Sequence, residues 1–189
     1  MPGLDVLKEE LPQYLSEMRR IRSQPGKEII FTRFMERVFG ISPETLSMEV
    51  PIESKILLVR GRVDAVFGNI LMEFKIDIRK ELDNAKEELT KYFQAHYEKY
   101  PGRSYIGISH DGLRFKVFQP TYSTQLDTGL RIVSSVKEID SLDLEREQNV
   151  EQIFLWFDSY LFTSERVIPT SEDIKRRLGT QSPTFYSRP

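Results

Sequence analysis

Hydrophobic residues recur three and four positions apart in four segments of the chain, the spacing of a helix that buries one face. Gly40 follows the second segment, in the position that commonly ends a helix. Pro101 and Gly102 stop the third. The spacing therefore predicts helices over 4–23, 27–39, 79–100 and 145–162.

Shorter apolar runs lie between these helices and are separated by turn residues. Gly68-Asn69 and Asp111-Gly112 are dipeptides favoured in tight turns between antiparallel strands. The order of helix, helix, strands, helix, strands, helix predicts an α/β fold with a mixed central sheet flanked by helices. The predicted strands are 47–60, 62–67, 70–75, 104–109, 113–118 and 129–136.

The 189 residues, 39% of them hydrophobic, are enough for one sizeable core. We expect one domain over 1–164, followed over 165–189 by a Ser/Pro-rich linker toward a possible further region. The chain has no cysteine and no apolar run of about 20 residues, the length that spans a membrane. These features predict a cytoplasmic protein without a membrane partner.

The net charge and the number of histidines limit which ligands and metal ions this chain is expected to bind. A formal net charge of −2 excludes a globally basic nucleic-acid binder. With no cysteine and only two histidines, any metal site is expected to use oxygen ligands, which favours Mg²⁺, Mn²⁺ or Ca²⁺ over Zn²⁺.

The segment 61–75 carries the most informative pattern. If Phe67 pairs with Ile70 across the turn, counting outward places Asp64 opposite Glu73. Lys75 lies two residues after Glu73 and so points to the same face of the sheet. Two facing carboxylates repel each other unless a cation or a shared proton intervenes. The spacing predicts a divalent-metal site, although a solvent-exposed hairpin face could carry the same residues without a function.

Metal-assisted cleavage of a phosphodiester needs carboxylates that hold the ion and a group that positions water. Asp64, Glu73 and the backbone carbonyl of Phe74 are the predicted metal ligands. The ammonium group of Lys75 would orient the attacking water or offset negative charge on the phosphate. A third acid could come from the second helix, where Glu28 is our choice and Glu36 is the rival.

Asp64 followed by Glu73-Phe74-Lys75 resembles the core of the PD-(D/E)xK nuclease superfamily, although Val63 replaces the proline of that motif. The stretch 28–41 is similar to the helix that opens the nuclease domain of single-chain restriction–modification enzymes. The segment 105–115 resembles the strand–turn–strand that closes such domains. The resemblance covers about 28–120.

The helix after Glu-x-Lys often carries a glutamine and a tyrosine in this superfamily. Two sets of residues match that pattern, and the sequence leaves both open. The first has glutamate in place of glutamine, and the second has a shortened spacing. The first set is Ala85, Glu88 and Tyr92, and the second is Gln94 with Tyr97.

The resemblance implies a restriction-endonuclease-like fold and a Mg²⁺-dependent DNA endonuclease, with Mn²⁺ as an expected substitute for Mg²⁺. The segment 168–179 resembles a connector toward an adenine-specific methyltransferase, so a longer chain could hold that enzyme and a target-recognition region. One alternative is a non-catalytic binding or scaffolding domain on the same fold. Another is a metal-dependent hydrolase that acts on something other than nucleic acid.

Overall fold

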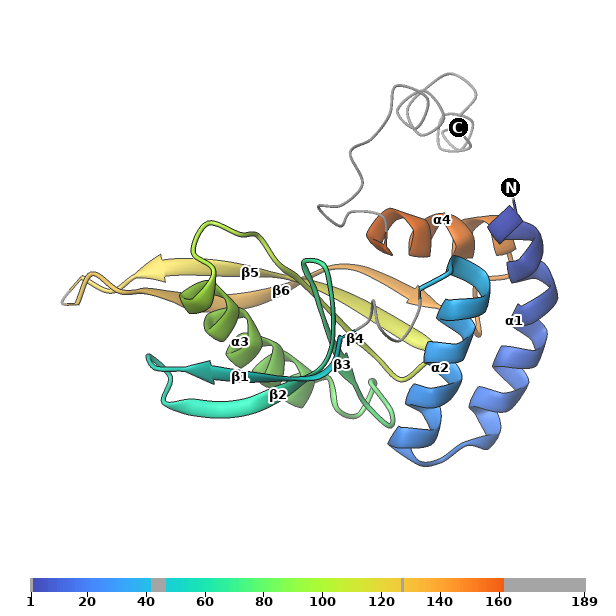
Figure 1. Ribbon diagram of the computed structural model, residues 1–189, viewed down its shortest axis with the longest axis horizontal. Coiled ribbons are helices and arrows are strands. Elements are labelled where there is room, and N and C mark those ends of the chain that lie inside the picture. The colour runs from blue at the N-terminus through green and yellow to red at the C-terminus, as the bar shows by residue number, and fades with distance from the viewer. Residues whose placement is uncertain (1, 42–46, 127, 162–189) are drawn as a thin grey trace, which may run out of the picture.

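The computed structural model describes residues 2–41, 47–126 and 128–161 (Figure 1). Within these ranges the chain is an α/β protein, with four helices packed on a six-stranded mixed sheet, as the order of elements predicts. The helices are α1 (Pro2–Arg20), α2 (Gln24–Phe39), α3 (Leu82–Lys99) and α4 (Val150–Leu161). The strands are β1 (Ser47–Ser54), β2 (Val59–Phe67), β3 (Ile70–Phe74), β4 (Ile106–His110), β5 (Arg114–Thr124) and β6 (Arg131–Asp143).

The six strands lie side by side in chain order. Every neighbouring pair is antiparallel except β3 and β4, which are parallel. A parallel pair needs a long crossover, and α3 supplies it. The crossover places α3 on one face of the sheet, where it contacts β3, the strand that carries Glu73.

Two hydrophobic clusters lie on opposite faces of the sheet. Helices α1, α2 and α4 contribute Met18, Phe34 and Phe157 to the larger cluster, where they meet inward residues of β3 and β5. The smaller cluster joins α3, through Leu89 and Phe93, to β1, β2 and β5. In Figure 1, α1 and α2 lie side by side at one end of the sheet, and α3 lies against the other half.

Helix α3 packs against the backbone of β4 at Gly107. A Cβ atom at this position would lie 2.8 Å from Cδ2 of Leu89 and 3.0 Å from Cζ of Phe93. Both of these side chains are fully buried, so there is little room for them to move aside. The missing side chain of Gly107 therefore sets how closely α3 approaches the sheet.

The predicted single strand over 47–60 is wrong. The chain turns after Ser54, and β2 begins at Val59. The Oγ atom of Ser54 accepts a hydrogen bond of 3.0 Å from the backbone N–H of Leu57, a local bond that stabilises the turn. Leu58 is 89% exposed and has a φ of 52°. The apolar run 56–59 therefore contains a turn and not a buried strand.

The other boundaries differ less. Strands β5 and β6 pair well beyond the predicted 113–118 and 129–136. Helix α4 begins at Val150 and not at 145, because the Oδ1 atom of Asn149 accepts a hydrogen bond of 2.9 Å from the N–H of Glu151. The predicted domain boundary at 164 and the segment 165–189 lie outside the described residues.

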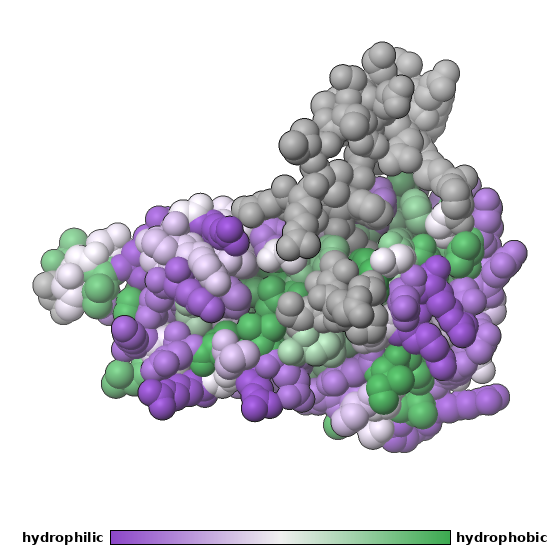
Figure 2. All heavy atoms as spheres, in the orientation of Figure 1, coloured by the Kyte–Doolittle hydropathy of each residue, from purple (hydrophilic) through white to green (hydrophobic). Residues whose placement is uncertain are grey.

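Hydrophilic residues cover much of the outer edge of the face shown in Figure 2, with hydrophobic residues between them. Among the described residues, no helix combines the length and the apolar character needed to cross a membrane.

Candidate active site

The β2–β3 hairpin has the predicted register. Phe67 pairs with Ile70, and the pairing continues to Ala65 and Met72. Gly68 adopts a φ of 59°, the left-handed conformation that its turn requires. The next positions along the two strands are Asp64 and Glu73, so the hairpin brings the two predicted carboxylates to the same end of the ladder.

At the end of this ladder, the side chain of Asp64 takes the place of a backbone hydrogen-bond partner. Its Oδ2 atom accepts a hydrogen bond of 2.7 Å from the backbone N–H of Phe74. The next N–H along the strand, that of Lys75, donates in the opposite direction to the carbonyl of His110 at 2.9 Å. The N–H and C=O of one strand residue point to the same side, so the Phe74 carbonyl is directed toward β2 and Asp64.

Glu73 and Lys75 form a buried ion pair on the face covered by α3. Their residues are 4% and 8% exposed, and the Lys75 Nζ atom lies 2.5 Å from Glu73 Oε1. The other carboxylate oxygen, Oε2, accepts a hydrogen bond of 2.6 Å from the hydroxyl of Tyr92 on α3. Burial and the charge of Glu73 raise the pKa of Tyr92 well above its ordinary value, so the phenol stays protonated and remains a donor.

The Asp64 carboxyl is strongly perturbed. Burial is the largest cause and the negative charge of Glu73 the second, and together they raise its pKa from the ordinary 3.8 to about 7. The hydrogen bond from Phe74 opposes this shift, and the charge of Glu28 adds to it. The charge of Glu73 therefore reaches Asp64 and opposes its ionisation, which is the condition that a bound cation relieves.

Helix α2 places Glu28 near enough for its charge to act on the Asp64 carboxyl, whereas Glu36 lies farther away. The neighbouring Lys27 is buried, and its Nζ donates a hydrogen bond of 2.6 Å to the carbonyl of Ile76, just after β3. This contact fixes the first turn of α2 against the end of the strand that carries Glu73. Glu36 is exposed, and it lies about 12 Å farther along the helix axis at 1.5 Å per residue.

The structure separates the two sets of residues proposed on α3. Tyr92 reaches Glu73, whereas Glu88 of the same set pairs with Lys91 at 2.7 Å. Gln94 faces β6, where its Oε1 atom accepts a hydrogen bond of 2.9 Å from the N–H of Val133. Tyr97 packs on the ring of Tyr122, with the ring centroids 4.9 Å apart.

Sequence reasoning missed two polar residues that hold the site in place. The first is Lys27, which nothing in the sequence distinguishes from a surface lysine. The second is Ser109, whose buried Oγ atom donates a hydrogen bond of 3.2 Å to the backbone carbonyl of Glu73. The predicted strand 104–109 contains Ser109, and that was a detectable signal, because a hydroxyl on a buried strand needs a partner.

Within the described residues, no three histidine or acidic side chains are grouped as a metal site. The donors that lie together are two carboxylates and the backbone carbonyl of Phe74. Comparisons of the chain with protein-family models, with curated proteins and with solved structures find no match.

Proposed function

We propose that this chain is a metal-dependent DNA endonuclease domain of the PD-(D/E)xK type, with a restriction-endonuclease-like fold. The observation that carries the proposal is the convergence of Asp64, Glu73 and Lys75 at one end of the β2–β3 hairpin. The mixed sheet with helices on both faces agrees with the fold that the sequence resemblance implies.

The donors suit a hard divalent cation such as Mg²⁺, or Mn²⁺ in its place. Asp64, Glu73 and the carbonyl of Phe74 would hold the ion. Each Glu73 oxygen accepts one hydrogen bond, and a carboxylate oxygen has a second lone pair to offer. The raised pKa of Asp64, about 7, supports the fit, because burial and the charge of Glu73 leave that carboxyl only partly ionised at neutral pH, and a bound cation would favour its ionised form.

When bound, Mg²⁺ supplies charge stabilisation for the phosphate and lowers the pKa of bound water. The residues of the chain position the reaction around it. Lys75 is held by Glu73, from where its ammonium group can orient water or stabilise negative charge on the phosphate. Tyr92 and Lys75 fix the Glu73 carboxylate from two directions. Glu28 is the candidate third acid beside Asp64.

The net charge of −2 suits a cleavage module that takes part of its DNA affinity from elsewhere. We therefore propose that the domain serves a restriction–modification protein, with target recognition and an adenine-specific methyltransferase in a longer cytoplasmic chain.

The test is nicking of supercoiled plasmid DNA in Mg²⁺, in Mn²⁺ and in EDTA, with wild type beside Lys75→Ala. We expect metal-dependent nicking that falls by about a hundredfold or more in Lys75→Ala. Lys116→Ala is the matched control, because it also breaks a lysine–glutamate pair, with Glu138 at 2.7 Å, but on β5 and β6. It should nick at the wild-type rate.

Three results would overturn the proposal. The first is full nicking by a folded Lys75→Ala protein, and the second is nicking that persists in EDTA. The third is a wild-type protein that neither nicks DNA nor gains thermal stability with Mn²⁺, which would favour the non-catalytic binding or scaffolding domain.

A further inference from the structure

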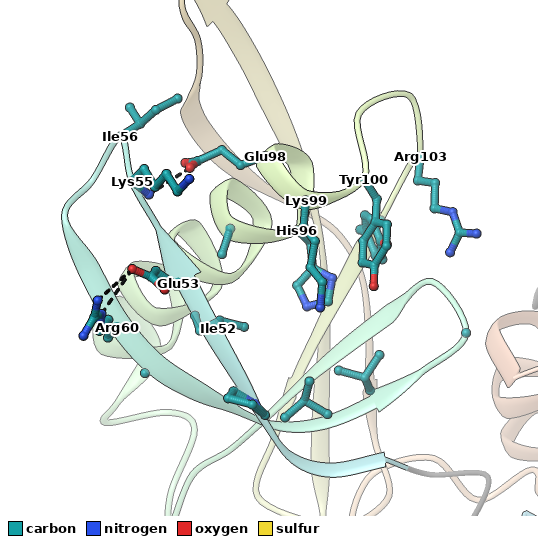
Figure 3. Close-up of a pocket in the computed structure, with 17 residues that line it drawn as sticks. Ile52, Glu53, Lys55, Ile56, Arg60, His96, Glu98, Lys99, Tyr100 and Arg103 are labelled. Carbon is teal, nitrogen blue, oxygen red and sulfur yellow. Dashed lines mark hydrogen bonds and ion pairs between the residues drawn. The ribbon is translucent and has the colours of Figure 1, made fainter.

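A cavity of about 1220 Å³ lies between the β1–β2 ribbon and the C-terminal end of α3. Its apolar wall includes Ile52, Val66 and Ala95, and polar and aromatic residues come from the end of α3 and the loop after it. Figure 3 shows the rings of His96, on α3, and of Tyr100, the residue just after α3, side by side and pointing into the space bounded by the strands. None of the residues assigned to cleavage lines this cavity.

His96 is a buried polar group left without a hydrogen-bond partner. It is 7% exposed, and neither ring nitrogen has a partner among the described residues. A buried imidazole normally satisfies at least one nitrogen, so an unpartnered ring at a cavity wall is suited to a ligand that supplies a donor and an acceptor.

The charge around the cavity is positive, although the whole chain is slightly acidic. Four basic residues line it against two acidic ones, an excess of two positive charges in a chain whose net charge is −2. The two carboxylates already have partners. Glu53 pairs with Arg60 at 3.0 Å, and Glu98 accepts hydrogen bonds from the Ser54 hydroxyl and the Lys55 N–H. The surplus charge favours an anionic ligand.

Tyr100 places an aromatic ring among these charges. It is 37% exposed, with the Nζ atom of Lys99 and the guanidinium carbon of Arg103 each 5.2 Å from the ring centroid. Aromatic side chains that stack on bases, set beside basic residues that contact phosphates, are the usual means of holding an unpaired nucleic-acid strand. The cavity has an aromatic ring and two basic side chains within five consecutive positions of the chain, 99–103.

The cavity also lies close to the proposed cleavage site. His96 is four residues after Tyr92, so the two side chains share a face of α3 about 6 Å apart along its axis. Tyr92 contacts Glu73, and His96 lines the cavity. A ligand in the cavity would therefore lie about one helical turn from the residue that orients the Glu73 carboxylate.

We infer that this cavity binds a short unpaired segment of the nucleic-acid substrate, with bases against Tyr100 and His96 and phosphates at Lys99 and Arg103. The inference rests on the proposed function for the class of its ligand. It adds a strand-holding site that is separate from the metal ligands, and it predicts a preference for single-stranded over fully paired DNA.

The test measures binding of a short fluorescein-labelled oligothymidylate to the full chain by fluorescence anisotropy, in EDTA so that no cleavage occurs. Tyr100→Ala and the double variant Lys99→Ala/Arg103→Ala should each weaken binding by about tenfold, whereas Tyr100→Phe keeps the ring and should bind like wild type. The double variant Lys8→Ala/Arg20→Ala is the matched control, because it removes the same charge from α1, on the opposite face of the sheet.

Unchanged binding in Tyr100→Ala, or equal competition by paired DNA of the same length, would overturn the inference. Plasmid nicking by the same preparations separates the two proposals. Metal-dependent nicking with normal oligonucleotide binding in Tyr100→Ala leaves the cleavage function standing and removes the strand site. Binding lost in Tyr100→Ala, in a wild-type protein that does not nick DNA, supports the strand site and removes the cleavage function.

Discussion

The hydroxyl of Tyr92 donates a hydrogen bond of 2.6 Å to Glu73, joining the crossover helix to the acidic end of the hairpin. In Tyr92→Phe that carboxylate oxygen loses its donor and the carboxylate gains freedom to rotate. Groups that orient a metal ligand typically change activity ten- to a hundredfold when removed. We expect about a tenfold slower metal-dependent nicking rate, measured on plasmid DNA at saturating Mg²⁺.

Tyr14→Phe is the control for this substitution. The buried Tyr14 hydroxyl donates a hydrogen bond of 2.5 Å to the carbonyl of Gly112, on the opposite face of the sheet. Both variants should lose about 1–2 kcal/mol of unfolding free energy. Only Tyr92→Phe should slow nicking, and an equal loss of rate in both would mean that reduced stability is the cause.

Asp64 is expected to lower the stability of the metal-free protein at alkaline pH. Its pKa in the folded chain, about 7, lies above the ordinary 3.8, so the folded state holds the proton more tightly and stability falls as pH rises between these values. After discounting for its partial exposure, the ionised form costs roughly 1–2 kcal/mol. Asp64→Asn should therefore melt at a higher temperature than wild type in EDTA at about pH 8, with little difference at about pH 4.

Metal adds a second readout for this variant. Mg²⁺ should raise the melting temperature of the wild type at alkaline pH and leave that of Asp64→Asn unchanged. An asparagine variant less stable than wild type at both pH values would contradict the argument, because it would mean that the carboxylate stabilises the fold without a metal.

His110 makes the fold sensitive to acid. Its ring is fully buried and stacks on Phe115, with centroids 4.7 Å apart, and burial lowers its pKa to about 3, with a smaller contribution from Lys27. The unfolded chain takes up a proton near the ordinary pKa of 6.5, so stability is lost as pH falls from about 6.5 toward 3. By about pH 4.5 the loss should reach roughly 2–3 kcal/mol.

His110→Phe removes this contribution and keeps the aromatic packing. Urea denaturation at neutral pH and at about pH 4.5 should show a smaller difference in unfolding free energy for the variant than for wild type. His96, whose pKa is lowered to about 4, should account for part of the acid sensitivity that remains. An unchanged pH dependence in the variant would refute the role of His110.

Gln94 is expected to be structural, although its sequence context resembles a nuclease motif. Its side chain accepts a hydrogen bond from the N–H of Val133 and donates one of 3.4 Å to the carbonyl of Arg131, which ties α3 to β6. Gln94→Ala should cost about 1–3 kcal/mol of unfolding free energy and leave the nicking rate of the folded protein unchanged. A large drop in the nicking rate of Gln94→Ala with normal stability would instead assign Gln94 to the proposed cleavage site.

The hairpin could be predicted because its register depends on local features. A two-residue turn at Gly68-Asn69 and a period of two decide which residues face each other, so the positions of Asp64 and Glu73 follow by counting. Tyr92 is one of the candidates on α3 that the family resemblance implies. Which of the two sets on α3 meets Glu73 depends on how the helix is rotated over the sheet, and tertiary packing decides that.

The missed boundaries have physical causes of the same kind. The sequence predicts one strand over 47–60, whereas the hydroxyl of Ser54 stabilises a turn within that range. Strand β6 alternates weakly between polar and apolar residues, because much of it pairs with β5 beyond the end of β4 and is exposed. Its length follows from cross-strand partners that lie elsewhere in the sequence.

The close packing of α3 against Gly107 limits which substitutions this protein can accept during evolution. Gly107 carries no chemistry and touches none of the proposed ligands, yet any side chain there would push against Leu89 and Phe93 on the helix that also carries Tyr92. A substitution at Gly107 would therefore alter the orientation of Glu73 from a distance. Under the proposed function, selection for cleavage would preserve a glycine at a position that has no reactive side chain.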